Sequence, residues 1–135
     1  YEIFKADYVK TQPVFRGQRL ALKKHPEFQG KEATFWHMTT TGDTEEDRLP
    51  DLRRMERIRW SSKMINGSQH PYLKVWRNKR KGNQESILIW HDDEKFLVVL
   101  RDRGDYILPW TTYVVDYPNQ ERKLMKEYKE YIAAI

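Results

Sequence analysis

The chain has 135 residues, no cysteine and a net charge of +5. This length favours one domain with a substantial core, and the lack of cysteine excludes disulfide frameworks and thiolate metal sites. No run of about 18 apolar residues is present and no signal peptide is visible, so we expect a single cytoplasmic domain over residues 1–135. Residues 51–81 hold ten of the 25 Lys and Arg residues but only two of the 20 Asp and Glu residues. Positive charge in one segment is typical of proteins that bind a polyanion.

The first half of the chain predicts short elements. Apolar residues at helical spacing predict a helix in the first 11 residues, and a hairpin follows around residues 16–18. Aromatic and β-branched residues dominate residues 33–40, which predicts a strand that carries His37. Pro50 suits the first turn of a helix, and the apolar spacing after it predicts a helix that ends at Asn66-Gly67.

The second half predicts an antiparallel meander. Residues 72–77 alternate between apolar and polar side chains, and three further apolar runs lie between residues 84 and 117. Turns rich in Asp, Glu and Gly separate these runs. Pro109 interrupts the last run, where we expect an edge strand or a bulge. After Pro118, apolar residues recur at helical spacing and predict a helix to the end of the chain.

Together these elements predict an α+β fold. We expect a single antiparallel β-sheet of about four or five strands that ends in the meander, with helices packed on one face and a C-terminal helix. Helices on only one face leave the other face free to form a cleft.

A few side chains are candidates for catalysis or phosphate binding. His37 has an ordinary pKa near neutrality and can act as acid or base, although a core histidine with a satisfied hydrogen bond is the simpler alternative. Arg101 and Arg103 can bind phosphate oxygens and stabilise developing charge, or lie in solvent at an ordinary turn. Thr111 and Tyr113 share one face of the last strand and can position a phosphate, but both residue types also favour strands.

Basic side chains between residues 51 and 81 are the candidates for holding a nucleic-acid strand. On the expected helix, Arg53 and Arg57 share a face that could follow a phosphate backbone, or that simply faces solvent. A basic loop follows further along the chain. The full set that we expect to contact nucleic acid is Arg53, Arg54, Arg57, Arg77, Lys79, Arg80 and Lys81.

Motifs for other chemistries are absent from the sequence. It contains no Walker loop and no GxGxxG, GxSxG or CxxC pattern, which disfavours nucleotide hydrolysis by known motifs, redox chemistry and serine hydrolysis. The run His91-Asp92-Asp93 suggests a metal site, but adjacent residues on a tight turn seldom chelate one ion. We therefore expect neither a metal nor a cofactor.

Three blocks of the sequence resemble a known group of proteins. They are Phe-Trp-His-Met at residues 35–38, Pro-Asp-Leu-Arg-Arg-Met-Glu-Arg-Ile-Arg-Trp at residues 50–60, and the meander that ends in Thr111-Thr112-Tyr113 before a helix. Over roughly residues 14–130 the chain resembles small phage and mobile-element proteins of the Barnase–EndoU–colicin–RelE type, which are metal-independent ribonucleases. Pro109-Trp110 departs from the smoother last strand of that group.

The resemblance implies a RelE- or barnase-like domain that cleaves RNA by attack of a 2′-hydroxyl on the adjacent phosphate, as a toxin or phage-defence effector. It implies a site made of His37, Arg101 or Arg103, and Thr111 with Tyr113. RNA is then the expected partner, and an antitoxin or immunity protein is a possible second one. Two alternatives stay open: a non-catalytic nucleic-acid-binding module, and a protein-interaction domain of a mobile element.

Overall fold

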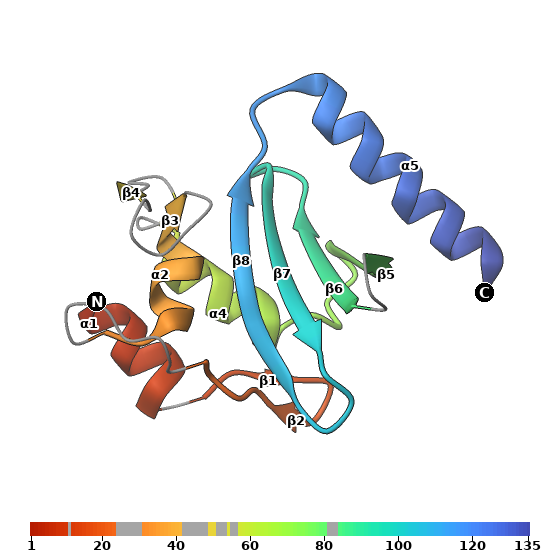
Figure 1. The fold of residues 1–135 in the computed structure, drawn as a ribbon. Helices are drawn as coiled ribbons and strands as arrows, with labels where there is room; N and C mark the ends of the chain where they lie inside the picture. Colours follow the sequence, from red (N-terminus) through yellow and green to blue (C-terminus); the bar gives the residue numbers. More distant parts are fainter. Residues whose placement is uncertain (11, 24–30, 42–48, 51–53, 55–56, 81–83) are drawn as a thin grey trace.

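A four-stranded antiparallel sheet forms the centre of the molecule (Figure 1). The computed structural model describes residues 1–10, 12–23, 31–41, 49–50, 54, 57–80 and 84–135. The strands lie in chain order: β5 (Leu73–Arg80), β6 (Gln84–His91), β7 (Phe96–Asp102) and β8 (Ile107–Val114). Each strand pairs with the next, so the sheet is the meander that the sequence predicts.

The N-terminal segment is helical and leads into a small hairpin, as predicted. Helix α1 (Glu2–Phe4) continues as the π-helical segment η1 (Lys5–Lys10). Strand β1 (Val14–Phe15) then pairs with β2 (Gln18–Arg19). The two turn residues between these strands have φ values of 48° and 85°, in the left-handed region that a tight two-residue hairpin turn requires.

The prediction of a strand over residues 33–40 was wrong. Residues Ala33–Thr39 form helix α2, so His37 lies on a helix. Phe35, Met38 and Thr39 are buried, a spacing of i, i+3 and i+4 that only a helix places on one face. Burial against neighbouring elements therefore outweighs the strand propensity of the aromatic and β-branched residues.

Pro50 lies at the end of β4 (Leu49–Pro50), which pairs with β3 (Thr40–Thr41). Most of the stretch that follows, which contains the start of the predicted helix, lies outside the described residues. Helix α4 (Ile58–Asn66) is followed by Gly67 as its C-cap, so it ends at Asn66-Gly67 as predicted from the sequence.

The two faces of the sheet bury separate apolar clusters. Ile87 and Ile89 of β6 belong to the cluster that packs against the N-terminal helices. Leu88 and Trp90 of the same strand belong to the cluster that packs against α5 (Pro118–Ala134). Because side chains alternate along a strand, a strand buried on both faces has the continuous apolar sequence that residues 87–90 show.

The α+β class, the antiparallel meander and the C-terminal helix are therefore confirmed. The N-terminal helices cover one face of the sheet, and α5 lies on the other side (Figure 1). The sequence had suggested that the second face is free of helices. In the structure, α5 packs on that face. Within the described residues, no helix has the length and apolar character needed to cross a membrane.

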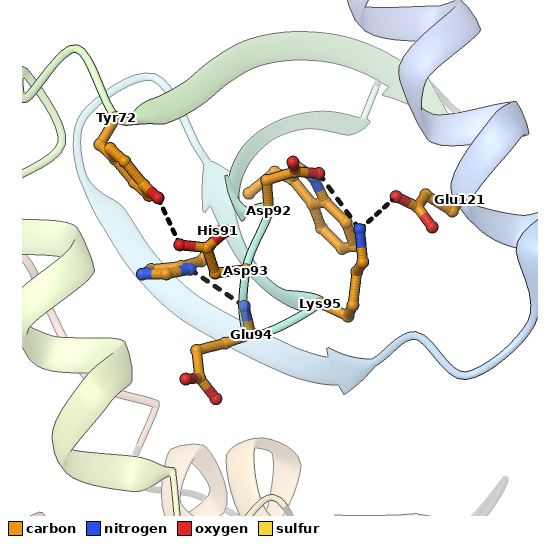
Figure 2. A network of polar contacts seen from close by, with 8 residues as sticks. Tyr72, His91, Asp92, Asp93, Glu94, Lys95 and Glu121 are labelled. Atoms are coloured by element: carbon orange, nitrogen blue, oxygen red, sulfur yellow. Dashed lines mark hydrogen bonds and ion pairs between the residues drawn. The ribbon is translucent and has the colours of Figure 1, made fainter.

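Helix α5 is fastened to the sheet at two places. Near its start, Glu121 Oε1 lies 2.6 Å from Nζ of Lys95 in the turn between β6 and β7 (Figure 2). That hydrogen bond is the main reason that the pKa of Lys95 is raised. Further along, Oε1 of Glu127 accepts a 2.8 Å hydrogen bond from Nε1 of Trp76 on β5. These contacts set the position of α5 above the sheet.

An ion pair also joins two strands of the sheet that are not neighbours. Arg77 on β5 reaches across β6, and its Nη1 lies 2.9 Å from Oδ2 of Asp102 on β7. The same nitrogen lies 3.5 Å from Oε1 of Glu85 on β6. The hydrogen bond from Arg77 lowers the pKa of Asp102, and a second hydrogen bond from the backbone N–H of Gly104 acts in the same direction.

Asp102→Asn should weaken the dependence of stability on pH in acid. A carboxyl whose pKa is lower in the folded state stabilises the fold fully above its unfolded pKa, and this contribution is lost as the pH falls through the folded-state value. Below about pH 4, wild-type stability should therefore fall more steeply than that of the variant. Urea titrations between about pH 3 and pH 6 measure the difference.

The control for this prediction is Asp105→Asn, a change at an exposed residue of the following turn. It should leave the pH dependence of the free energy of unfolding close to that of the wild type. The same acid dependence in wild type and Asp102→Asn would show that the Arg77–Asp102 pair does not contribute to stability.

Candidate active site

A bulge in the edge strand β8 places Trp110 at the centre of the candidate site. Val99 of β7 pairs with Thr111, whereas the next residue, Leu100, pairs with Pro109. Trp110 is therefore an extra residue in the ladder, and the chain bends there. The bulge lies where the sequence predicted an edge or a bulge, because Pro109 has no N–H to donate to a neighbouring strand.

Basic and titratable side chains surround the Trp110 indole. The His37 ring stacks on it, with ring centroids 4.9 Å apart and an angle of 23° between the planes. The guanidinium carbons of Arg101 and Arg103 lie 4.8 Å and 5.6 Å from its centroid, and Nζ of Lys23 lies 5.5 Å away. Cation–π attraction favours this arrangement. The indole thus brings together three of the residues predicted for the site.

Thr111 joins helix α2 to strand β8. Its hydroxyl donates a 3.0 Å hydrogen bond to the carbonyl oxygen of His37 and lies 3.4 Å from Nη1 of Arg54, which donates to it. The next residue, Thr112, donates a 2.8 Å hydrogen bond to the carbonyl of Met38. Carbonyls at the end of a helix have no partner within the helix. The two threonines satisfy them, and this fixes His37 beside the bulge.

Arg54 lies inside the protein and next to Tyr113. Its side chain is only 7 % exposed, and Nη1 donates a 2.8 Å hydrogen bond to the carbonyl of Thr40, just beyond α2. The guanidinium carbon lies 4.8 Å from the centroid of the Tyr113 ring, which is itself 45 % exposed. Arg54 was a candidate for contact with nucleic acid; its place in the structure is that of a support for α2 and for Tyr113.

The other basic candidates whose side chains the structure describes are not among the cations at the Trp110 ring. Arg77 pairs in register with Ile87 and so lies on the face of the sheet that packs against the N-terminal helices. Lys79 is exposed two residues further along β5, and Arg57 immediately precedes α4. Three candidates have side chains that fall outside the described part of the structure: Arg53, Arg80 and Lys81.

A cleft of about 990 Å³ opens beside Trp110, between the sheet and α5. Leu88, Leu97 and Val99 line it from the sheet, and all are largely buried. Arg101, Trp110, Thr111 and Tyr113 also line it, which places them on its β7–β8 side. A mostly apolar cleft with a few polar groups is typical of ligand-binding sites. Three of the candidate catalytic residues, Arg101, Thr111 and Tyr113, thus line a space large enough for a substrate, whereas His37 and Arg103 are not part of its lining.

The turn that suggested a metal site has internal uses for its polar groups (Figure 2). Asp92 accepts a 3.3 Å hydrogen bond from Nε1 of Trp90, and this contact contributes most to the lowering of its pKa. Asp93 accepts a hydrogen bond from the hydroxyl of Tyr72. In the part of the chain that the structure describes, no group of three His, Asp or Glu residues is arranged to hold a metal ion.

Comparison of the chain with protein-family models, with curated proteins and with solved structures finds no match. Any inference about the chemistry of the site therefore rests on its geometry. An imidazole and two guanidinium groups lie within 5.6 Å of the centre of one ring. This set can bind a phosphate group and transfer a proton beside it. Trp110 and Lys23 were not among the predicted site residues, although the Pro109-Trp110 interruption marked the position of the first.

Arg54→Met should lower the free energy of unfolding by about 2–3 kcal/mol, because the change removes a charge-assisted hydrogen bond and leaves the Thr40 carbonyl without it. Methionine keeps much of the apolar stem of the arginine, so the loss reports mainly on the polar contacts. Urea denaturation followed by tryptophan fluorescence measures the change. The control, Lys79→Met at an exposed position, should stay within about 0.5 kcal/mol of wild type. Equal stability of the two variants would contradict the internal role of Arg54.

Proposed function

We propose that this chain is a metal-independent endoribonuclease whose active site surrounds Trp110. The observation that carries the proposal is the meeting of His37, Arg101 and Arg103 at one indole, with Tyr113 on the adjoining cleft. Cleavage of RNA by its own 2′-hydroxyl needs a base, an acid and positive charge near the phosphate, and these side chains supply all three.

In the proposed reaction, the ribose 2′-oxygen forms a bond to phosphorus and the bond from phosphorus to the 5′-oxygen breaks. His37 accepts the proton of the 2′-hydroxyl, and Tyr113 donates a proton to the departing 5′-oxygen. Arg101 and Arg103 bind the non-bridging oxygens and stabilise the extra negative charge of the phosphorane. The products carry a 2′,3′-cyclic phosphate and a 5′-hydroxyl.

Two features of the site support these roles. First, the indole attracts cations, so it favours the close approach of like-charged arginines that would otherwise repel each other. Second, the hydrogen bond from Thr111 to the His37 carbonyl fixes the backbone that carries the imidazole. Thr111 is therefore a positioning residue in this proposal. Action as a toxin or phage-defence effector in the cytoplasm, with an antitoxin or immunity protein as partner, belongs to the same proposal.

His37→Ala and Tyr113→Phe should each lower the cleavage rate by roughly 10²–10⁴, the range for the loss of a positioned acid or base. Neither change should alter RNA affinity much, since neither removes a permanent charge. Single-turnover cleavage of a labelled oligoribonucleotide measures the rate, and fluorescence anisotropy measures the affinity. His70→Ala, at an exposed histidine outside the site, is the control.

The proposed chemistry also requires a 2′-hydroxyl in the substrate and no metal ion in solution. A substrate with 2′-deoxyribose at the scissile position should be inert, and cleavage should survive EDTA. Loss of activity in chelator with rescue by magnesium or manganese would contradict the mechanism. If the protein binds RNA but never cleaves it, the chain is a nucleic-acid-binding module instead.

Affinity for single-stranded RNA should fall steeply as the salt concentration rises, because bound phosphates release counterions. Arg103→Glu should weaken binding and make this dependence shallower, since Arg103 lies at the proposed phosphate site. Lys79→Glu, the same change of charge on the opposite face of the sheet, should have a smaller effect. An anisotropy titration at several salt concentrations measures both, and the absence of binding at low salt would rule out RNA as the partner.

A further inference from the structure

The cleft beneath α5 extends well beyond the residues that the proposed reaction uses. It reaches from Trp110 and Arg101 across Leu88 to Glu127 on α5, and encloses about 990 Å³. This volume is at the upper end of the range for small-molecule sites. Phosphate chemistry at the β7–β8 side leaves the remaining, mostly apolar space without a role.

Ser86 places a polar atom among the apolar residues of this cleft. The residue is 2 % exposed and lines the cleft, yet its Oγ has no hydrogen-bond partner among the described residues. In the sheet, Ser86 is opposite Asn78 on one side and Arg101 on the other. The side-chain oxygen of Asn78 is also buried with no partner in the described part of the chain. Buried polar groups are normally satisfied, so this position is suited to a ligand with hydrogen-bonding edges.

The side of the cleft next to the candidate active site supplies a cation for the phosphate of a nucleotide and aromatic rings for its base. Arg101 belongs to both sites, and its guanidinium donates a hydrogen bond to Gln84, which also lines the cleft. Trp110 and Tyr113 provide aromatic rings on the same side. Unpaired bases bind proteins by stacking on aromatic and apolar surfaces and by hydrogen bonds along their edges. A flat base, a polar edge and an adjoining phosphate match this arrangement of apolar residues, Ser86 and Arg101.

We infer that the cleft binds one unpaired nucleobase of the RNA, with the base edge at Ser86 and the attached phosphate at Arg101. This inference rests on the proposed ribonuclease function for its substrate. It adds a base-binding subsite to that function, and such a subsite gives the enzyme a preference for the base next to the scissile bond. α5 then forms one wall of the subsite.

The test uses the four nucleoside 3′-monophosphates as probes and ribose 5-phosphate as the probe without a base. At least one nucleotide should bind about 5- to 100-fold more tightly than ribose 5-phosphate by calorimetry, the range expected for one stacked base. In ¹H–¹⁵N NMR spectra, it should shift the amide signals of Leu88, Leu97 and Leu124, which line the cleft.

Ser86→Ala should weaken nucleotide binding by roughly 3- to 10-fold through the lost hydrogen bond, and should leave ribose 5-phosphate unaffected. Ser68→Ala, a change at another buried serine that does not line the cleft, is the matched control. Val99→Phe is a second variant that keeps a strand-forming side chain and fills the cleft, and it should abolish the preference for nucleotides over ribose 5-phosphate.

Equal affinity for nucleotides and ribose 5-phosphate would overturn the inference, and so would nucleotide binding that neither Ser86→Ala nor Val99→Phe changes. The RNA cleavage assay is scored separately. RNA cleavage by a protein whose cleft binds no base would leave the ribonuclease proposal standing and remove the subsite. Base binding in the cleft by a protein that cleaves no RNA would leave the base-binding subsite standing and remove the ribonuclease proposal.

Discussion

The contact between Trp110 and the cations around it is the interaction on which the rest of the candidate site depends. Two guanidinium groups at one place repel each other, and a histidine that takes up a proton there adds to the repulsion. The face of an indole is negative, so each cation gains attraction from the ring. The bulge in β8 makes the arrangement possible, because it gives the tryptophan a position outside the regular ladder.

The cleft follows from a different property, the burial of the sheet on both faces. One face packs against the N-terminal helices, and the other packs against α5. Between α5 and that face lies a cleft whose lining includes Leu97 and Val99 on the sheet and Leu124 on α5. The Lys95–Glu121 pair and the contacts of Glu127 to β5 determine the distance between α5 and the sheet. The stability of the fold and the width of the cleft therefore depend on the same few residues.

The sequence predicted the elements whose signal is local. The meander was predictable because each apolar run ends in a turn of Asp and Gly residues, and the bulge was predictable because proline cannot donate a ladder hydrogen bond. Helix α2 was not, since residues 33–40 combine strand propensity with a burial pattern that depends on distant partners. The burial of Arg54 was not predictable for the same reason, because its contacts are with distant residues, Thr40 and Thr111. The sequence does not show which arginine of a cluster is buried.

Three of the residues chosen from the sequence lie together in the structure, but the sequence did not indicate what joins them. His37, Arg101 and Arg103 do meet at Trp110, although sequence spacing said nothing of the ring between them. Thr111 was chosen for its hydroxyl, and in the structure that hydroxyl is bonded to the carbonyl of His37 within the protein.

Strand β8 lies at the edge of the sheet. An exposed edge strand is a template on which another chain can add a strand and begin an aggregate. The bulge at Trp110 breaks the regular ladder of this edge, and α2 packs against it through Thr111 and Thr112. The features of the candidate site therefore also make the edge a poor template for another strand.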